Sequence, residues 1–327
     1  MHCIIPAAGM GTRMRPHTWS VPKPLLPVAG KPILAHLIDS LTSVGVDRLT
    51  LVTGYLGSML VDWTRNAYPG HTVDFVEQKH VSGLGAAVGL ARDLVDDGPV
   101  MVALADTLFE ADLGILRNCP VNMLAVCPVT EPERFGIVVT DPNGRVLRLV
   151  EKPKEPVGNL AIVGVYYFAQ GSSLMRACDE LSRLGITTRG EYQLTDAMQL
   201  MLQGGQPFET IPVEKWYDCG TTETLLFTNR ALLDSRGGTG TPSLENSVVV
   251  QPCAFGQGVV LRDSVVGPHV SVGDGAVIER CVIRDSVLGA GVRVNGGSMT
   301  GSMLGAGTVV RQTPKSLSIG DDCSLEI

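Results

Sequence analysis

Short apolar runs alternate with stretches of helical spacing along the N-terminal third of the chain. The runs have the length and composition of buried strands and lie at residues 3–8, 48–53, 72–76 and 100–104. The stretches between them carry apolar side chains on one helix face, at residues 33–44, 56–68 and 83–95. This alternation predicts right-handed crossovers and a mostly parallel sheet covered on both faces, an α/β fold of Rossmann-like type.

Strand signals become denser between residues 122 and 168. A run at 134–140, a turn at Asp141-Pro142-Asn143-Gly144 and a run at 145–150 predict a hairpin. Helices are then expected to begin near Gly190 and to cover residues 222–233. Together these segments predict a first domain at residues 1–234.

A different periodicity follows a glycine-rich linker predicted at residues 235–243. Apolar residues recur mostly every six positions, at Val260, Val266, Val272, Ile278, Val282, Leu288 and Val294. Small residues lie at the corners between them, as in Leu288-Gly289-Ala290-Gly291. This pattern resembles a left-handed parallel β-helix. We predict this domain at residues 244–327, with its coils ending before the Asp321-Asp322 tail.

Composition excludes several classes of protein. The 327 residues include 44% hydrophobic and 18% charged residues, and the net charge is −7 without a lysine- or arginine-rich run. This balance argues against a nucleic-acid surface, and no apolar stretch has the roughly 20 residues that cross a bilayer. Met1-His2 leads directly into the first strand, which leaves no room for a signal peptide. The eight scattered cysteines are typical of reduced thiols, so we expect a cytoplasmic protein.

A glycine-containing loop follows the first apolar run. Its sequence is Gly9-Met10-Gly11-Thr12-Arg13-Met14-Arg15-Pro16, and Pro22-Lys23-Pro24-Leu25-Leu26-Pro27 comes soon after. Glycines at the end of a strand allow backbone N–H groups to approach a phosphate, and Arg13 and Lys23 add positive charge. Neither the Rossmann nor the Walker pattern is present, and two glycines alone also fit an ordinary strand–loop turn.

The complete string, with Gly-x-Gly-Thr-Arg-Met-x-Pro and Pro-Lys-Pro-Leu-Leu-Pro-Val-x-Gly-Lys-Pro, resembles the signature of sugar-1-phosphate nucleotidylyltransferases. This resemblance implies transfer of a nucleotidyl group from an NTP to a sugar 1-phosphate. It also implies that Arg13, Lys23 and Lys152 act in catalysis. The implied nucleotide-binding residues are Ala8, Gly9, Gly11, Thr12, Arg13, Gln78 and Gly83.

Gln78 and Gly83 lie where the resembled family holds the nucleobase. A glutamine offers both a donor and an acceptor, which suits the edge of a pyrimidine. The alternative interpretation, from the residues alone, is a solvated glutamine beside a helix N-terminus.

Two aspartates match the metal ligands of the family. Asp106 follows Leu104-Ala105, and Asp218 belongs to the string Trp216-Tyr217-Asp218-Cys219-Gly220-Thr221. Ala105 and Thr107 depart from the commoner Gly-Asp-Asn or Gly-Asp-His form, and a strand-end aspartate is also typical of a cap. The resemblance implies that Asp106 and Asp218 hold Mg²⁺, a hard ion that prefers carboxylate oxygens.

The sugar-binding residues implied by the family are Gly136, Glu151, Lys152 and Gly164. Glu151-Lys152-Pro153 matches the family's Glu-Lys-Pro. Without the family pattern, these two charges fit a solvated pair at a turn better than a ligand site. Gly190-Glu191-Tyr192-Gln193-Leu194-Thr195-Asp196 matches a further family string.

The predicted reaction joins dTTP or UTP to glucose 1-phosphate, with Mg²⁺ as the cofactor, and releases pyrophosphate. The expected partners are these substrates and further copies of the chain, without nucleic acid or membrane. Two alternatives stay open: a non-catalytic subunit that binds nucleotide sugars, and a bifunctional enzyme whose β-helix transfers an acyl group. His269, the single histidine in the β-helix region, is the candidate residue for the second alternative.

Overall fold

The structure is a computed structural model that describes residues 1–117 and 119–312. The described chain forms two compact units. The first unit comprises Met1–Leu26 and Lys31–Thr224, and the second comprises Pro27–Gly30 and the described residues from Leu225 onward. The predicted boundaries at residues 234 and 243 stay predictions, and residues 313–327 of the predicted β-helix domain lie outside the described part.

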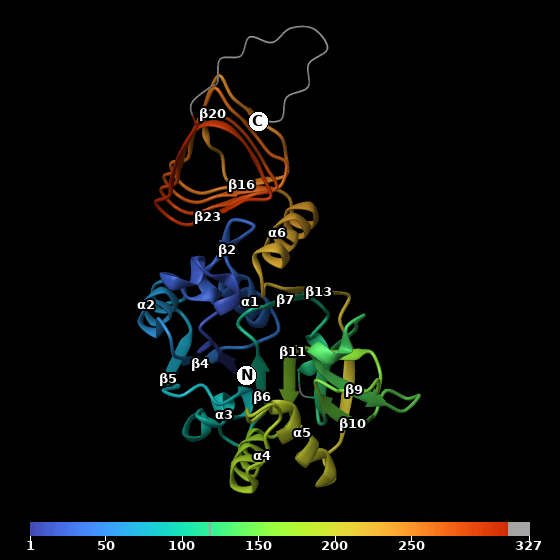
Figure 1. Cartoon of the computed structure of the whole chain (residues 1–327). Helices are drawn as coiled ribbons and strands as arrows, with labels where there is room; N and C mark the ends of the chain where they lie inside the picture. Colours follow the sequence, from blue (N-terminus) through green and yellow to red (C-terminus); the bar gives the residue numbers. More distant parts are fainter. Residues whose placement is uncertain (118, 313–327) are drawn as a thin grey trace. The chain divides into compact units, whose positions relative to one another are not determined.

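The first unit is built on a mixed sheet with the main order β10-β9-β11-β6-β1-β4-β5 (Figure 1). Four neighbouring strands run parallel: β1 (His2–Pro6), β4 (Arg48–Thr53), β5 (Thr72–Glu77) and β6 (Val100–Ala103). The remaining strands of this sheet are β8 (Asn122–Pro128), β9 (Gly136–Thr140), β10 (Val146–Glu151), β11 (Leu160–Phe168) and β12 (Phe208–Pro212). The predicted α/β class is confirmed.

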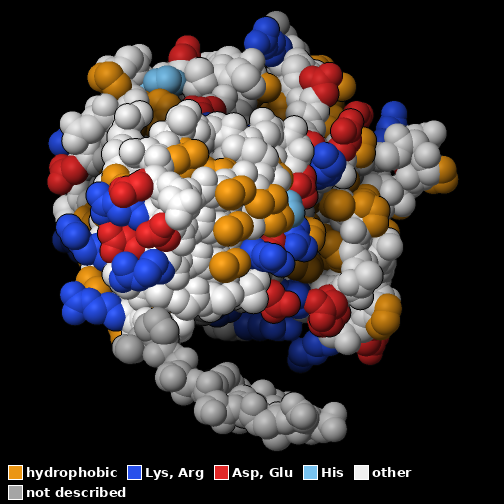
Figure 2. All heavy atoms as spheres, turned by 90° about the horizontal axis from the view of Figure 1, so that it is seen from above, with side chains coloured by type: hydrophobic (Ala, Val, Ile, Leu, Met, Phe, Trp, Pro, Cys, Tyr) orange, Lys and Arg blue, Asp and Glu red, His pale blue; other side chains and the backbone are white. Residues whose placement is uncertain are grey.

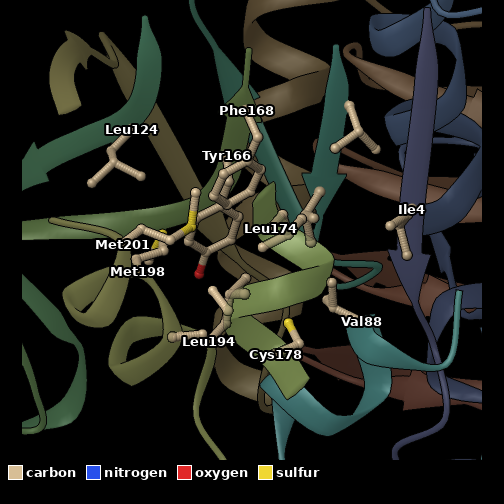
Figure 3. Packing of buried hydrophobic residues seen from close by; sticks show 14 of the residues in the cluster. Ile4, Val88, Leu124, Tyr166, Phe168, Leu174, Cys178, Leu194, Met198 and Met201 are labelled. Carbon is tan, nitrogen blue, oxygen red and sulfur yellow. The ribbon is translucent and has the colours of Figure 1, made fainter. Parts of the chain in front are cut away.

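Alternating side chains on β1 explain why both faces of the sheet are covered. Cys3 and Ile5 belong to one apolar cluster with residues of α1 (Ile33–Ser43) and α2 (Gly57–Ala67). Ile4 belongs to the opposite cluster, which contains residues of α3 (Leu84–Gly89), α4 (Gly171–Leu184) and α5 (Leu194–Gln203). Figure 3 shows this second cluster around Tyr166 and Phe168. A strand buried on both faces needs consecutive apolar residues, which β1 provides at Cys3, Ile4 and Ile5.

Shorter elements complete the first unit. A two-stranded sheet pairs β7 (Thr107–Glu110) with β13 (Lys215–Asp218), so that Thr107 lies opposite Asp218. The strand β3 (Lys31–Pro32) precedes α1, whereas β2 (Pro27–Val28) belongs to the second unit. The helix predicted at 83–95 is shorter than expected, because α3 ends at Gly89 and a 3₁₀ turn covers Arg92–Leu94.

The second unit contains most of α6 (Thr222–Arg236) and a parallel β-helix. Within residues 243–312, all pairings between strands of the β-helix are parallel, and this confirms the predicted architecture. The strands are β14 (Ser243–Glu245), β15 (Val248–Val249), β16 (Cys253–Phe255), β17 (Val260–Arg262), β18 (Val265–Val266), β19 (Val270–Val272), β20 (Val277–Arg284), β21 (Val287–Leu288), β22 (Arg293–Thr300), β23 (Met303–Leu304) and β24 (Val309–Arg311).

The coils are shorter than a strict six-residue repeat requires. Arg262 lies beside Glu245, 17 residues earlier, whereas Asn295 lies beside Glu279, 16 residues earlier. Three faces of six residues would need 18 residues per coil. Two members of the six-residue pattern, Val260 and Val282, are not core positions. Their neighbours Leu261 and Ile283 are fully buried instead, and Val282 is 37% exposed.

Charged side chains are distributed with both signs over the surface. On the face shown in Figure 2, Lys and Arg lie interspersed with Asp and Glu. On the β-helix, Arg262 forms ion pairs with Glu245 at 3.0 Å and with Glu279 at 2.8 Å. Exposed pairs of this kind contribute about 0–1 kcal/mol each, so the apolar interior provides most of the stability of the coils. No helix among the described residues is long and apolar enough to cross a membrane.

Candidate active site

A pocket of about 540 Å³ lies in the first unit, beyond the carboxyl ends of three parallel strands. Its lining includes Pro6 to Gly9 after β1, Gln78 after β5, and Leu104 to Asp106 after β6. The remaining lining residues are Gly11, Thr12, Arg13, Lys23, Pro24, Val81, Gly83, Leu84, Ala87, Glu191, Gln193 and Gly220. Ligands of open α/β sheets bind at this edge, because loops from neighbouring strands meet there.

The loop after β1 has the backbone geometry of an anion site. Gly11 adopts φ +59°, and a Cβ there would lie 3.0 Å from the Thr18 side chain. Thr18 donates its hydroxyl hydrogen to the Gly11 carbonyl at 2.8 Å, which holds the turn closed. No described residue accepts a hydrogen bond from the backbone N–H groups of Gly9, Met10 or Gly11. These donors are therefore available to a phosphate.

Lys23 also lines the pocket, on the 3₁₀ turn Lys23–Leu25 beside the glycine loop, where a Cβ on Gly11 would lie 3.1 Å from the Cβ of Lys23. The residue is only 8% exposed, and its Nζ donates to Asp106 Oδ2 at 2.5 Å. A buried ammonium needs an anionic partner, and the strand-end aspartate supplies one. The structure therefore brings together the two charges that the sequence placed in separate motifs.

Asp218 is half-buried close to Arg13 and Gly220. A Cβ on Gly220 would lie 2.9 Å from both Asp218 carboxylate oxygens and 3.2 Å from an Arg13 guanidinium nitrogen. Burial raises the pKa of Asp218, and the nearby negative charge of Asp106 raises this pKa further, whereas Lys23 and Arg13 oppose the shift. Burial and the second carboxylate thus disfavour the charged form of Asp218, and an additional cation nearby would stabilise that form.

These two carboxylates fit a magnesium ion. No side chain among the described residues donates a hydrogen bond to the Asp218 oxygens, and Asp106 has one oxygen engaged by Lys23. No group of three or more His, Cys, Asp and Glu residues in the described ranges is arranged to hold a metal. Mg²⁺ matches such a site, because it binds through one or two carboxylates and takes phosphate and water oxygens at its other positions.

Gln78 and Gly83 line the same pocket, next to the segment Glu191–Gln193. Gln78 is 7% exposed, and its side-chain Nε2 has no hydrogen-bond partner among the described residues. A Cβ on Gly83 would lie 2.4 Å from the Tyr192 carbonyl oxygen, so only glycine fits there. A buried amide without a partner is costly, and it indicates a place for a ligand.

Glu151 lies at the end of β10, opposite Gly136 of β9. Thr195 at the start of α5 donates its hydroxyl hydrogen to Glu151 Oε2 at 2.7 Å. A Cβ on Gly136 would lie 2.8 Å from the Thr195 hydroxyl and 3.0 Å from Glu151 Oε2. Lys152 follows with φ +44°, and its Nζ lies 3.3 Å from Glu151 Oε1. Gly136, Glu151 and Lys152 therefore form one cluster.

The structure divides the predicted residues into two sets. Those that line the pocket are Ala8, Gly9, Gly11, Thr12, Arg13, Lys23, Gln78, Gly83 and Asp106. Those outside the lining are Gly136, Glu151, Lys152, Gly164 and Asp218. Gly164 is nevertheless close, because its carbonyl accepts a 2.9 Å hydrogen bond from the N–H of Leu104, a lining residue.

The predicted set omitted several residues that the structure places at the site. Glu191 and Gly220 line the pocket, and Thr195 positions Glu151. All three belong to family strings quoted in the sequence analysis, so the match to those strings could have identified them as site residues. Gln193, which donates to Glu191 at 2.8 Å, also lies in such a string, between matched positions.

The fold and the pocket define a nucleotide-binding α/β enzyme with a β-helix attached. A family model described as nucleotidyl transferase matches residues 2–235. The chain belongs to this family. The predicted enzyme class, a sugar-1-phosphate nucleotidyltransferase, is confirmed by this match together with the relatives and solved structures that follow.

The chain is similar to several curated proteins. It is 35% identical over 251 residues to the bifunctional protein GlmU of Methanocaldococcus jannaschii, covering 77% of this chain and 59% of that protein. It is 31% identical to the UTP–glucose-1-phosphate uridylyltransferase AglF of Haloferax volcanii, covering 66% of this chain and 89% of that one. It is 28% identical to the glucose-1-phosphate thymidylyltransferase of Streptomyces antibioticus, covering 84% and 83%.

Solved structures agree with this assignment. A UDP-glucose pyrophosphorylase complexed with UDP-glucose superposes with a TM-score of 0.63 at 26% identity, covering 72% of this chain and 99% of that one. A glucose-1-phosphate thymidylyltransferase from Bacillus anthracis, described as putative, gives a TM-score of 0.62 at 26% identity, covering 74% and 98%. The relatives differ in the substrates that their names give, so they leave the nucleotide and the sugar of this chain open.

Proposed function

We propose that this chain transfers a nucleotidyl group from dTTP or UTP to glucose 1-phosphate and releases pyrophosphate. The observation that carries the proposal is the pocket, in which the glycine loop, Lys23, Asp106 and Gln78 meet at the carboxyl edge of the sheet. This pocket offers backbone donors and fixed cations to phosphates at one side and an unpaired amide to a base at the other.

The nucleotide is held by the first of the two residue sets. Backbone N–H groups of Gly9 and Gly11, beside Ala8 and Thr12, donate to the triphosphate. The exposed Arg13 and the buried Lys23 neutralise phosphate charge. Gln78 gives its free Nε2 to an acceptor on the pyrimidine, and the backbone of Gly83, another lining residue, lies close to the ring.

The sugar phosphate is held by the second set. Glu151 accepts hydrogen bonds from sugar hydroxyls, and the backbone of Gly136 and Gly164 lies against the hexose. Lys152 binds its phosphate. An oxygen of that phosphate attacks the α-phosphorus in line, a new P–O bond forms, and the bond to pyrophosphate breaks. The attacking oxygen is already anionic, so the reaction needs no general base, and the chain contributes positioning and charge neutralisation.

Asp106 and Asp218 would hold Mg²⁺. The ion supplies positive charge to the reacting phosphates, which is its usual role in such sites. The raised pKa of Asp218 is consistent with this assignment, because a nearby cation relieves the repulsion between the two carboxylates.

Neither alternative has comparable support. A non-catalytic subunit would not need the charges of Arg13, Lys23, Asp106 and Asp218, all of which are present. For an acyltransferase, His269 is the candidate base, but both of its ring nitrogens are engaged, by Asp234 at 2.8 Å and by Asp285 at 3.1 Å. The predicted homo-oligomer and the cytoplasmic location stay predictions.

The test is pyrophosphate release in the presence of Mg²⁺, measured for each NTP and dTTP against glucose, mannose and N-acetylglucosamine 1-phosphates. The highest kcat/KM is expected with dTTP or UTP and glucose 1-phosphate. In the Gln78→Leu variant the KM for the preferred NTP should rise about tenfold, because one hydrogen bond to the base is lost. Tight binding of nucleotide sugars without turnover for any pair would contradict the proposal and favour the regulatory alternative.

A further inference from the structure

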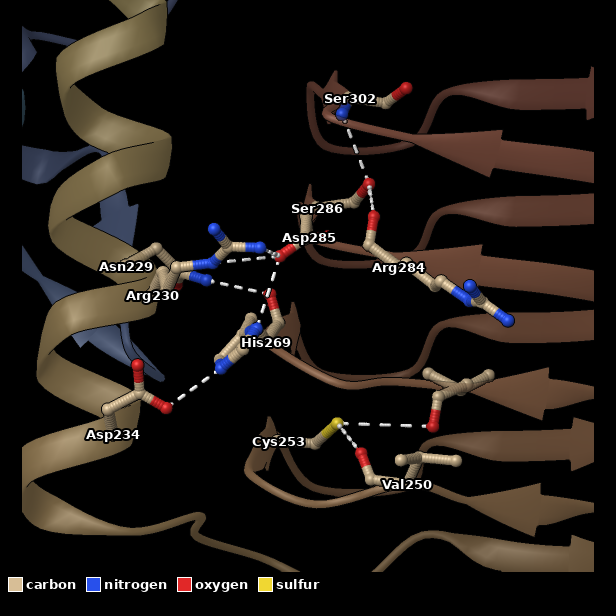
Figure 4. Close-up of polar contacts among 11 residues, drawn as sticks. Asn229, Arg230, Asp234, Val250, Cys253, His269, Arg284, Asp285, Ser286 and Ser302 are labelled. Carbon is tan, nitrogen blue, oxygen red and sulfur yellow. Dashed lines mark hydrogen bonds and ion pairs between the residues drawn. The ribbon is translucent and has the colours of Figure 1, made fainter.

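One asparagine of α6 ties three segments of the second unit together. Asn229 is 1% exposed. Its Oδ1 accepts hydrogen bonds from the backbone N–H of Ala29 at 2.9 Å and from the Ser271 hydroxyl at 2.6 Å. Its Nδ2 donates to the His269 carbonyl at 3.0 Å (Figure 4). The side chain therefore connects the segment Pro27–Gly30 with the β-helix.

The segment Pro27–Gly30 has a conformation that needs such support. Ala29 adopts φ +45° and Gly30 adopts φ +88°, so two consecutive residues lie in the left-handed region. For alanine this region costs energy, which neighbouring contacts must offset. A Cβ on Gly30 would lie 3.0 Å from Ala254 and 3.1 Å from the Thr239 hydroxyl, so the β-helix contacts the segment closely.

The same segment is the continuation of the turn that carries Lys23. The 3₁₀ turn Lys23–Leu25 is closed by hydrogen bonds from the Leu25 N–H to the Pro22 carbonyl at 2.8 Å and from the Leu26 N–H to the Lys23 carbonyl at 3.0 Å. Pro24, and Pro27 at the start of the segment, restrict the backbone that leads from Lys23 to the segment. A stiff connection transmits a displacement of the segment to Lys23 instead of absorbing it.

The other end of the anchor also leads to the site. Asn229 lies on α6, which begins at Thr222, two residues after the pocket residue Gly220 and four after Asp218. Along the chain, α6 leads from Asn229 back to Asp218, the predicted metal ligand. The hydrogen bond from Ala29 joins Asn229 to the segment that follows the Lys23 turn.

We propose that Asn229 is a positioning residue for nucleotidyl transfer: by holding Ala29 it keeps the Lys23 turn in place. This inference rests on the proposed function, since Lys23 is the group that it positions.

The experiment compares Asn229→Ala with Arg230→Ala. Arg230 lies on the same helix and contacts the same unit through Asp285 at 2.6 Å, but it makes no hydrogen bond to the segment Pro27–Gly30. The Asn229→Ala variant should raise the KM for the NTP and lower kcat/KM about tenfold or more, because a misplacement of about 1 Å can cost about 100-fold. The Arg230→Ala variant should keep both values. If the Asn229→Ala variant only contained less folded enzyme, its KM would stay unchanged, so a raised KM distinguishes misplacement from unfolding.

A second measurement does not depend on activity. Hydrogen exchange of the Ala29 amide should accelerate in Asn229→Ala and stay unchanged in Arg230→Ala. If Asn229→Ala does not fold, Ser271→Ala provides the same test with a smaller expected effect, because it removes one hydrogen bond to Asn229 Oδ1.

The outcomes separate the two proposals. A wild-type enzyme without activity on any substrate pair would refute the proposed function. An active wild-type enzyme whose Asn229→Ala variant exchanges faster at Ala29 but keeps its kcat/KM would refute the positioning role alone. Unchanged exchange at Ala29 in a folded Asn229→Ala variant would refute the anchor itself.

Discussion

Lys23 Nζ lies 2.5 Å from Asp106 Oδ2, and this contact joins the loop after β1 to the end of β6. The lysine is therefore held beside the predicted metal site as well as beside the glycine loop. The positive charge of Lys23 thus lies near two groups of negatively charged oxygens: those of the carboxylates, and those of the phosphates in the proposed reaction.

Removal of this cation should reduce turnover strongly. In Lys23→Met, kcat is expected to fall about 100-fold or more, because a fixed charge directed at the transition state is lost. Arg15→Met is a matched control: Arg15 lies in the same loop, is exposed, and does not line the pocket. Steady-state kinetics with the preferred substrate pair measure the effect, and equal losses in both variants would argue against a specific role for Lys23.

Asp218→Asn should separate stability from activity. Because burial raises its pKa in the folded protein, the protonated form favours folding. This stabilisation is complete below the unfolded pKa and is lost as the pH rises through the folded pKa. In EDTA at neutral pH, Asp218→Asn should thus have a Tm a few degrees above that of the wild type, and the difference should shrink as the pH falls.

The same variant tests the metal assignment. Mg²⁺ should raise the Tm of the wild type, because a ligand that binds only the folded state stabilises it. It should leave the Tm of Asp218→Asn almost unchanged, and pyrophosphate release by this variant should be lost. Near-normal turnover in Asp218→Asn would exclude Asp218 as a metal ligand.

Thr195→Val should weaken binding of the sugar phosphate. Thr195 donates to Glu151 Oε2 at 2.7 Å, and a hydrogen bond to a charged group contributes about 1.5–3 kcal/mol. Without it, the carboxylate is free to rotate, and the KM for the sugar 1-phosphate should rise about tenfold while the KM for the NTP stays the same. Thr195→Ser keeps the hydroxyl and should retain the wild-type values; a comparable loss in that variant would point to packing instead.

The register of the β-helix predicts different costs for two neighbouring substitutions. Leu261 is fully buried in the coil, whereas Val260 is only partly buried. Leu261→Ala should lower the free energy of unfolding of the second unit by about 2–5 kcal/mol, and Val260→Ala should cost clearly less. Chemical denaturation followed by a probe in the β-helix measures both, and the opposite ranking would favour a strict six-residue repeat.

Local patterns were sufficient wherever neighbours along the chain decide the structure. The strand predicted at residues 48–53 is β4, with the same bounds, because a run of apolar residues between polar turns has few other ways to be buried. The glycine loop, the hairpin and the Glu151-Lys152 turn were also recognisable in the sequence. In the same way, the strings around Arg13, Asp106 and Asp218 sufficed to identify the family.

Other features depend on contacts between distant residues, which no local pattern contains. The helix predicted at 83–95 stops at Gly89, and the coils have 16 or 17 residues because the β-helix closes on its own interior. The hydrogen bonds from Thr195 to Glu151 and from Ala29 to Asn229 join segments that only the folded chain brings together. The sequence by itself determined the residue types, the periodicities and the family. The tertiary structure alone decided which side chains meet, since that depends on packing in three dimensions.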